Sequence, residues 1–185
     1  MSSDVFIISS ARGPAAQPAI SQALQLAGLR AAQVQDVLFG FDGPFEPEAP
    51  ASAAQAAGLT GPLAVVSPGL RALLFAAASL LSDGAELALV VGLDGQAAAA
   101  ALLASAEAVG RLNLFPCARL AGRSLRGPGA ALRQAGLQPA DLEVSRESPR
   151  GALLLLDDLL KDLESRRARW GMLRAGELAL VIERL

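Results

Sequence analysis

The sequence contains no histidine and no tyrosine, and it has one cysteine, Cys117, and one lysine, Lys161, among its 185 residues. Histidine is the usual general base, the usual partner of a serine or cysteine nucleophile, and the commonest metal ligand. Its absence leaves carboxylates, arginines, serines and one thiol for any chemistry. No spacing of residues resembles a metal site, and no glycine-rich phosphate motif is present. We therefore expect no metal and no cofactor.

The chain also lacks a strong charge of either sign and a long apolar run. Its formal net charge of −2 gives no electrostatic basis for binding nucleic acid. Hydrophobic residues make up 52% of the sequence, yet no apolar run is long enough to cross a membrane. The N-terminus has no basic stretch followed by an apolar one, so we expect no signal peptide. A single cysteine cannot form an internal disulfide. These absences predict a cytoplasmic protein with neither membrane nor nucleic-acid partners.

Residues 62–94 form the most clearly patterned stretch of the chain. Leu63–Val66 and Leu87–Val91 are apolar runs bounded by proline or glycine, which is typical of strands covered on both faces. Leu70–Leu81 between them has almost no polar face, which predicts a helix buried all round. An α/β fold often places a nucleophile or a phosphate cradle at such a strand-to-helix turn. Here the turn, Val66–Gly69, is poor in reactive groups.

The other segments continue an α/β pattern with a loop between most elements. Further strands are predicted at 5–8, 34–41, 117–122 and 141–147, with a closing hairpin at 172–182; helices are predicted at 19–29, 51–59, 96–110, 128–137 and 149–169. Residues 9–18 and 42–50 are predicted loops, the second either a solvated connector or a lid. The helix at 149–169 has Ser148 as its expected N-cap. Its predicted inward stripe is Leu153, Leu156, Leu160 and Leu163.

Two segments recur in the same order along the chain. Residues 23–34 resemble 131–142, and residues 86–91 resemble 177–182. We interpret this as a duplicated α/β unit, with chance similarity in an alanine- and leucine-rich chain as the alternative. The predicted fold is α/β, with two pseudo-repeated halves packed in layers at residues 1–110 and 111–185. The second half is shorter by about one helix and one strand.

These segments resemble the thiolase family. Val5–Pro14 resembles the opening strand of that family and its Ala-Arg-Thr-Pro turn. Gly69–Ala72 resembles the helix that begins in the family's Cys-Gly-Ser-Gly-Leu-Lys-Ala motif, and Asp83–Gly92 resembles the strand that follows. Pro116–Gly122 resembles the start of the second thiolase half, and Trp170–Gly171 a part of its end. The resemblance implies a thiolase-like fold over most of the chain.

The same resemblance implies that the catalytic groups of the family are missing. Val66 stands where thiolases have the acyl-accepting cysteine, and valine supplies no nucleophile. The Asn-Glu-Ala-Phe motif is replaced by Ser145–Ser148, and the late Cys-x-Gly loop by Leu173–Gly176. The Gly-His-Pro motif has no counterpart in a chain without histidine. The insertion that covers coenzyme A in thiolases is reduced to roughly residues 96–111.

Two residues are weak candidates for a substitute nucleophile. Ser67 lies in the central turn, but no histidine can activate it and Pro68 follows it, so a turn or cap role is the plainer interpretation. Cys117 begins an apolar strand, so we expect it to be a small buried side chain rather than a reactive thiol.

Charged residues offer three further candidates. Glu147 is either a lone acid or base or a surface carboxylate at a helix entry. Asp157 and Asp158 are adjacent on a helix and point in different directions, so we expect no carboxylate dyad. The arginines within 166–169 would hold a phosphate of coenzyme A or an acidic partner, or else form a solvated helix end.

Together these features favour a non-catalytic protein that acts as a structural or regulatory subunit. The resemblance implies association through the edge strand Leu63–Val66, either in a homodimer or with an active thiolase or condensing enzyme. The apolar helix behind that strand would be under-buried in so small a monomer. Two alternatives are an acyl-CoA acyltransferase (acetyl-CoA acetyltransferase-like) of altered or weak activity, and a module that binds acyl-CoA without turnover.

Overall fold

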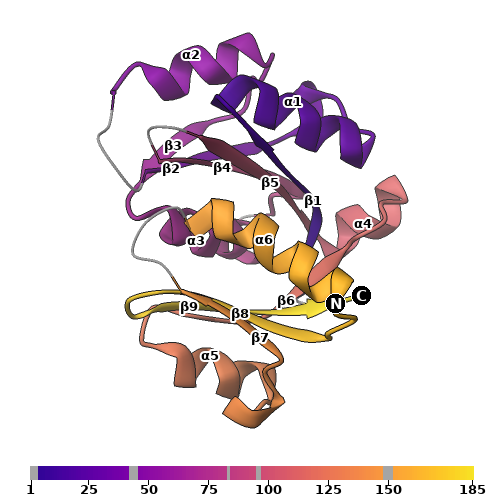
Figure 1. The fold of residues 1–185 in the computed structure, drawn as a ribbon. Coiled ribbons are helices and arrows are strands. Elements are labelled where there is room, and N and C mark those ends of the chain that lie inside the picture. Colours follow the sequence, from indigo (N-terminus) through magenta and orange to yellow (C-terminus); the bar gives the residue numbers. More distant parts are fainter. Residues whose placement is uncertain (1–3, 42–45, 83, 95–96, 148–151) are drawn as a thin grey trace.

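The structure is a computed structural model that describes residues 4–41, 46–82, 84–94, 97–147 and 152–185 (Figure 1). The first part of the chain contains β1 (Val5–Gly13), α1 (Ala16–Ala27), η1 (Ala31–Gln33), β2 (Asp36–Phe41), α2 (Ala49–Ala56), β3 (Leu63–Val66), α3 (Gly69–Ser82), β4 (Leu87–Leu93), β5 (Ala98–Ser105) and α4 (Ala106–Leu112). The rest contains β6 (Ala118–Ser124), α5 (Pro128–Ala135), η2 (Pro139–Asp141), β7 (Val144–Glu147), α6 (Ala152–Ser165), β8 (Trp170–Ala175) and β9 (Leu178–Arg184).

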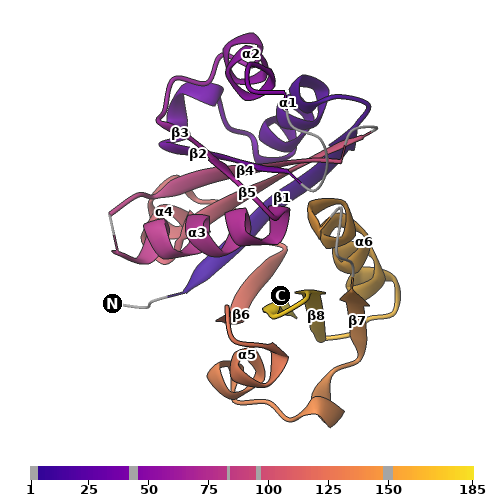
Figure 2. The same ribbon diagram turned by 90° about the vertical axis from the view of Figure 1, so that its left-hand side faces the viewer.

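The strands form one ladder in the order β3-β2-β4-β5-β1-β6-β9-β8-β7. Its weakest link is the antiparallel contact between β1 and β6, which has only the register pairs Phe6–Arg119 and Ile7–Ala118. The ladder therefore consists of two half-sheets that diverge from this junction (Figures 1 and 2). In the first half-sheet β2 lies parallel to β3 and β4, while β5 runs antiparallel to β4 and β1.

Helices fill the space between the half-sheets and cover their outer faces. Helices α3 and α6 lie in the middle layer, α1 and α2 lie over the first half-sheet, and α5 lies over the second (Figures 1 and 2). Helix α6 turns four leucines inward and buries them almost completely: Leu153, Leu156, Leu159 and Leu163. These side chains share one core with α3 and with the inner faces of both half-sheets. Apolar helical faces that need cover on two sides explain why the α/β layers stack as the sequence predicts.

One predicted helix is a strand. Residues 96–110 were predicted as helical because of their alanine content, but Ala98–Ser105 is β5 and only Ala106–Leu112 is helical. Strand β5 is buried on both faces between β4 and β1. Small alanine side chains suit a strand covered closely by a helix on each side, and this tertiary context overrides helix propensity. The segment is therefore a central strand and not the remainder of a lid.

The strand and helix at the centre of the sequence are more exposed than predicted. Strand β3 has three exposed residues and one partly buried residue, because it is the edge of the ladder and no described strand pairs beyond it. Helix α3 buries most of its surface but leaves Arg71, Phe75, Ala78 and Ser82 exposed, so it is not buried all round.

Several element ends differ from the predictions. Strand β1 runs on to Gly13, so the predicted loop at 9–18 is short. The described part of α6 ends at Ser165, before the predicted end, and Arg167 just beyond it adopts a left-handed backbone with φ 55°. The predicted stripe of α6 uses Leu159, with Leu160 only partly buried. The proposed cap Ser148 and residues 42–45 of the predicted loop lie outside the described residues. The end of that predicted loop is helical, because α2 begins at Ala49.

The two recurring sequence segments differ in what they mean structurally. Residues 23–34 and 131–142 occupy equivalent places, since α1 and α5 both end in a left-handed glycine and lead into a 3-10 turn. Residues 86–91 and 177–182 do not occupy equivalent places in the two half-sheets. Strand β4 is parallel to one neighbour, whereas β9 is antiparallel to both of its neighbours, as β5 is. That second match is wrong as a structural equivalence. The duplication and the boundary at residue 110 stay predictions.

The close approach of β2 to the start of α3 gives a test of the packing. A Cβ atom on Gly40 would lie 2.7 Å from the Cα of Gly69. We expect Gly40→Ala to lower the free energy of unfolding by about 2 kcal/mol, measured by urea denaturation followed by circular dichroism. Gly110→Ala is the control, because a Cβ there meets nothing within 4 Å and alanine favours the helix by about 0.5–1 kcal/mol. Equal effects of the two changes would contradict the packing described here.

Candidate functional site

The turn between β3 and α3 is where the sequence comparison with thiolases places Val66 instead of a nucleophilic cysteine. Val66 ends β3 and packs partly buried against the central core. Ser67 is exposed, and its Oγ donates a hydrogen bond to the backbone oxygen of Phe41 at 3.1 Å. Within the described part of the chain, no titratable side chain hydrogen-bonds to Ser67. The hydroxyl therefore ties the turn to the end of β2 and has no base to activate it.

The segments that replace the later thiolase motifs form ion pairs at the other end of the ladder. Glu147, at the end of β7, pairs with Arg174 of β8. Arg146 of β7 pairs with Asp162 of α6. Glu147 is therefore exposed and neutralised by a neighbouring strand, which fits a surface carboxylate better than a lone acid or base.

Asp157 is a buried carboxylate that joins the two halves of the molecule. Its Oδ1 accepts a hydrogen bond from Ser10 at 2.7 Å, and its Oδ2 lies 2.6 Å from Lys161 Nζ and 3.3 Å from Arg12 Nε. Asp158 Oδ2 lies 2.7 Å from Arg12 Nη2. The two adjacent aspartates thus meet at the same guanidinium, although they do not pair with each other. Because Arg12 belongs to β1, this cluster fastens the first half-sheet to α6.

Cys117 is exposed, contrary to the prediction that it is a small buried residue. It precedes β6 at the rim of a cavity of about 530 Å³ between β1, α6 and the end of β9, and its Sγ donates to the backbone oxygen of Ile7 at 3.3 Å. Although the residue as a whole is exposed, the hydrogen bond of its Sγ to Ile7 is partly buried, and desolvation by the surrounding protein raises the pKa of the thiol to about 11. The backbone hydrogen bond opposes this rise, and the Glu164 carboxylate adds to it. A thiol that stays protonated at neutral pH is a poor nucleophile.

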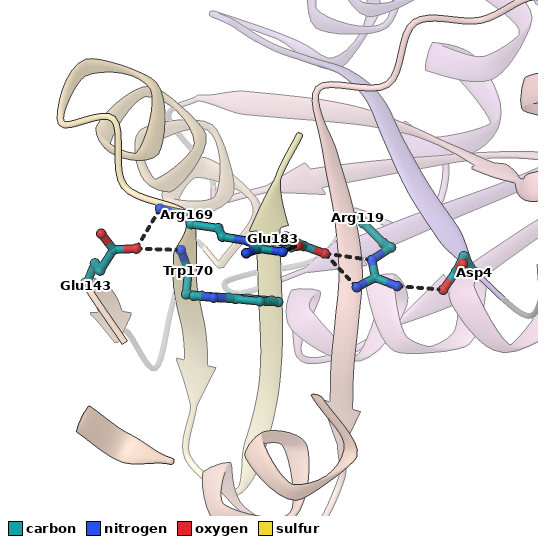
Figure 3. Close-up of polar contacts among 6 residues, drawn as sticks. All are labelled: Asp4, Arg119, Glu143, Arg169, Trp170 and Glu183. Carbon is teal, nitrogen blue, oxygen red and sulfur yellow. Dashed lines mark hydrogen bonds and ion pairs between the residues drawn. The ribbon is translucent and has the colours of Figure 1, made fainter. Parts of the chain in front are cut away.

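Glu183 of β9 is the centre of a second ionic cluster, shown in Figure 3. Its nearly buried carboxylate lies 2.6 Å from Arg169 Nη2 on one side and 2.6 Å from Arg119 Nη2 on the other. Arg119 of β6 also contacts Asp4, next to the start of β1, at 3.1 Å. Burial raises the pKa of Glu183, but the hydrogen bonds from Arg169 and Arg119 outweigh it and lower the pKa below its ordinary value.

The arginines after α6 are largely used inside the protein. Arg169 pairs with Glu183 and lies with its guanidinium carbon 5.1 Å from the centre of the Trp170 ring. Glu143 fixes the same stretch, since it accepts the backbone N–H groups of Arg169 and Trp170 at 2.6 and 3.0 Å (Figure 3). These two hydrogen bonds lower the pKa of Glu143. Arg166 is paired with Asp162 at 3.9 Å. This arrangement argues against the hypothesis that the segment holds a phosphate.

A second cavity, of about 690 Å³, lies between the N-terminal ends of α1 and α2 and is lined mainly by small and apolar residues. Neither cavity is lined by Val66 or Ser67. The described residues contain no cluster of histidine, cysteine or acidic side chains that fits a metal ion. None of the helices described is long and apolar enough to span a membrane.

Sequence reasoning missed Arg12, Arg119 and Glu183, which organise the two ionic clusters. Arg12 and Arg119 have partners more than sixty residues away in the sequence. Glu183 also pairs with Arg169, which lies just before the neighbouring strand β8. No local spacing in the sequence therefore identifies these residues. The only signal in the sequence was that charged residues interrupt apolar strands at Arg119 and Glu183.

The raised pKa of Cys117 predicts a slow thiol. At pH 8 we expect its alkylation by iodoacetamide to be about tenfold slower or more than that of free cysteine, because the smaller thiolate fraction outweighs the greater nucleophilicity of a thiolate with a higher pKa. Glu164→Gln should speed the reaction by removing a carboxylate that disfavours the thiolate. The urea-unfolded protein is the control and should react at the ordinary rate. A folded protein that reacts as fast as the unfolded one would disprove the assignment.

Glu183→Gln tests the ionic cluster at the junction. We expect the free energy of unfolding at pH 7 to fall by about 2 kcal/mol, because two arginines lose the charge that they share. Since the folded pKa is lowered, the carboxylate stabilises the protein above its unfolded pKa, and this contribution disappears as pH falls through the folded pKa. The wild type should therefore lose more stability than the variant between about pH 5 and pH 3. Glu46→Gln, at an exposed position, is the control; parallel pH profiles of wild type and E183Q would refute the prediction.

The sequence matches no family model and no curated protein. Solved structures do match. Human mitochondrial 3-ketoacyl-CoA thiolase aligns with a TM-score of 0.81 and 12% identity, over 98% of this chain and 99% of that one. The human mitochondrial thiolase in complex with CoA gives a TM-score of 0.81 and 12% identity, over 98% of each chain. The Bacillus anthracis acetyl-CoA acetyltransferase gives 0.81 and 13%, over 98% of this chain and 99% of that one. The TM-scores establish the fold, and sequence identities this low leave the activity open. The protein therefore has a thiolase-like α/β fold, as the resemblance in its sequence implied.

Proposed function

We propose that the protein is a non-catalytic thiolase-like subunit that acts through association, as a homodimer or with an active thiolase-fold enzyme. Acyl transfer to an enzyme requires an activated nucleophile and donors aimed at the developing oxyanion. Val66 offers neither, Ser67 is hydrogen-bonded to a backbone oxygen, and Cys117 is held as a thiol. The chain is thus better suited to presenting a surface than to carrying an acyl group.

The observation that carries the proposal is the contrast between the two edges of the ladder. Edge strand β7 presents Arg146 and Glu147, each in an ion pair, and charged side chains of this kind discourage pairing with another strand. Edge strand β3 has no charged residue, and Leu63 and Val65 are 39% and 45% exposed. An uncharged, apolar edge is a template for a strand from another chain.

The elements on either side of β3 extend this uncharged surface. From Ala49 to Ser82, a stretch that spans α2, β3 and α3, the sequence contains a single charged residue, Arg71. The exposed side chains of this stretch include Gln55, Val65 and Phe75. Depletion of charge with a retained arginine and an exposed aromatic is the composition found at the centre of protein interfaces.

An acyl-CoA-binding role is the second candidate. One of the similar structures, the human mitochondrial 3-ketoacyl-CoA thiolase, is in complex with CoA. In that role the chain would hold a CoA ester without turnover, or would act as an acyltransferase of weak or altered activity through Ser67 or Cys117.

Val65→Lys tests the association. A lysine at the centre of an apolar edge must be desolvated on pairing, so we expect the variant to dissociate at concentrations about 100-fold higher than the wild type does. Sedimentation velocity over a dilution series measures this for the protein alone, and again with a purified acetyl-CoA acetyltransferase. Ser145→Lys, on the opposite edge strand β7, is the matched control and should leave the assembly unchanged.

Two results would count against the proposal. Assembly that survives Val65→Lys but fails in Ser145→Lys would place the interface at β7. Incubation with acetyl-CoA followed by mass spectrometry of the intact protein tests the rival enzyme. A stable acetyl group on Ser67 or Cys117, lost in the corresponding alanine variant, would favour an acyltransferase.

A further inference from the structure

The cavity that includes Cys117 lies between the two halves of the chain. Residues of β1, of the second part of α6 and of the end of β9 line it, and its volume of about 530 Å³ is within the range of small-molecule sites. Its wall combines apolar side chains, among them Ile8, Leu26 and Leu160, with four charged residues. Two of the four, Asp157 and Lys161, already pair with each other at 2.6 Å.

The other two charged residues of the cavity have no ionic partner among the described residues. Glu164, in the last turn of α6, forms no side-chain hydrogen bond or ion pair in this part of the chain. Arg184 of β9 donates only to backbone oxygens, from Nε to Ala168 at 2.9 Å and from Nη2 to Arg167 at 3.3 Å. The remaining N–H groups of its guanidinium have no carboxylate to bind. One cavity therefore contains an unpaired anion and an unpaired cation.

These two unpaired charges lie in the same part of the cavity. The guanidinium of Arg184 is held at the carbonyl groups of residues 167 and 168, three and four residues after Glu164. The carboxylate of Glu164 in turn acts on the thiol of Cys117 at the rim. A ligand with only a negative charge would meet Glu164, and a ligand with only a positive charge would meet Arg184. A small molecule that carries both charges is complementary to both residues.

We propose that this cavity binds a zwitterionic α-amino acid with an apolar side chain. Its carboxylate accepts hydrogen bonds from the unused N–H groups of Arg184, whose planar fork suits a carboxylate. Its ammonium group donates to Glu164, and its side chain lies against Leu26 and Leu160. The site is separate from the β3 edge, so the inference goes beyond the proposed function and does not require association with another chain.

Four small probes test whether both charges select the ligand. L-leucine and L-phenylalanine carry both charges, N-acetyl-L-leucine lacks the cation, and L-leucinamide lacks the anion. In isothermal titration calorimetry we expect the two amino acids to bind saturably. Leucinamide should bind about tenfold more weakly than leucine because it loses the partly buried Arg184, and N-acetyl-leucine about fivefold more weakly because Glu164 is more exposed.

Variants of the two charged residues assign each preference to one side chain. Glu164→Gln should remove the preference for leucine over N-acetyl-leucine, and Arg184→Gln the preference for leucine over leucinamide. Glu107→Gln and Arg133→Gln, at exposed positions outside the cavity, are the matched controls and should leave both preferences unchanged. Circular dichroism checks that each variant is folded. Glu164 has no side-chain partner in the described protein, so its variant tests the site even if Arg184→Gln does not fold.

The single cysteine gives an independent measurement of occupancy. Bound leucine covers part of the cavity that Cys117 lines, so it should slow the alkylation of Cys117 in the wild type and have less effect in Glu164→Gln. An absence of saturable binding by leucine and phenylalanine up to about 20 mM would overturn the proposal. Equal binding of leucine and its two analogues would overturn it as well, because the two charges would then not select the ligand.

Discussion

The narrow junction between β1 and β6 is the constraint on which the rest of the structure depends. Two residue pairs join the half-sheets there, so backbone hydrogen bonds alone hold them only weakly. Side chains at the two ends of β1 reinforce the junction: Asp4 reaches Arg119 beside the start of the strand, and Arg12 reaches Asp157 and Asp158 toward its other end. Because both contacts cross from one half of the chain to the other, β1 acts as the common support of the molecule.

The divergence of the half-sheets creates the middle layer, and the middle layer accounts for the exposed surface. Helices α3 and α6 fill the wedge that opens beyond the junction, and each must bury apolar side chains against both half-sheets. Helix α6 is enclosed by β7, β8 and β1. Helix α3 lies on the side where the ladder ends at β3, so one of its faces has no described element to cover it. The uncharged surface around Phe75 is thus a direct consequence of where the ladder stops.

The sequence predicted the layered α/β fold and most of its elements, because apolar runs and helix caps are local signals. It failed at β5, where alanines favour a helix locally but pack closely between neighbours in the folded chain. It also predicted that β4 and β9 are equivalent strands of a repeat, since both are rich in valine and leucine and both follow an acidic residue. The two strands differ in whether their neighbours run parallel or antiparallel, and strand direction leaves no local signal in the sequence. For the candidate site, the sequence predicted only that Val66 stands where a nucleophilic cysteine is expected. Arg12, Arg119 and Glu183 depend on contacts between distant segments, which no residue spacing reports.

Whether the buried carboxylates are fully neutralised by cations helps to distinguish a catalytic site from a structural role. A catalytic acid or base often lacks a full set of hydrogen-bond and ionic partners, which shifts its pKa toward the pH at which the enzyme works. The two nearly buried carboxylates here are in the opposite condition. Asp157 is held by a serine and two cations, and Glu183 by two arginines that outweigh its desolvation and lower its pKa. Charges neutralised in this way stabilise the fold, and through Arg12 and Asp4 they link β1 to the second half of the chain. Buried charges that hold two halves together, beside a stretch from Ala49 to Ser82 that carries a single charged residue, Arg71, fit the association that we propose.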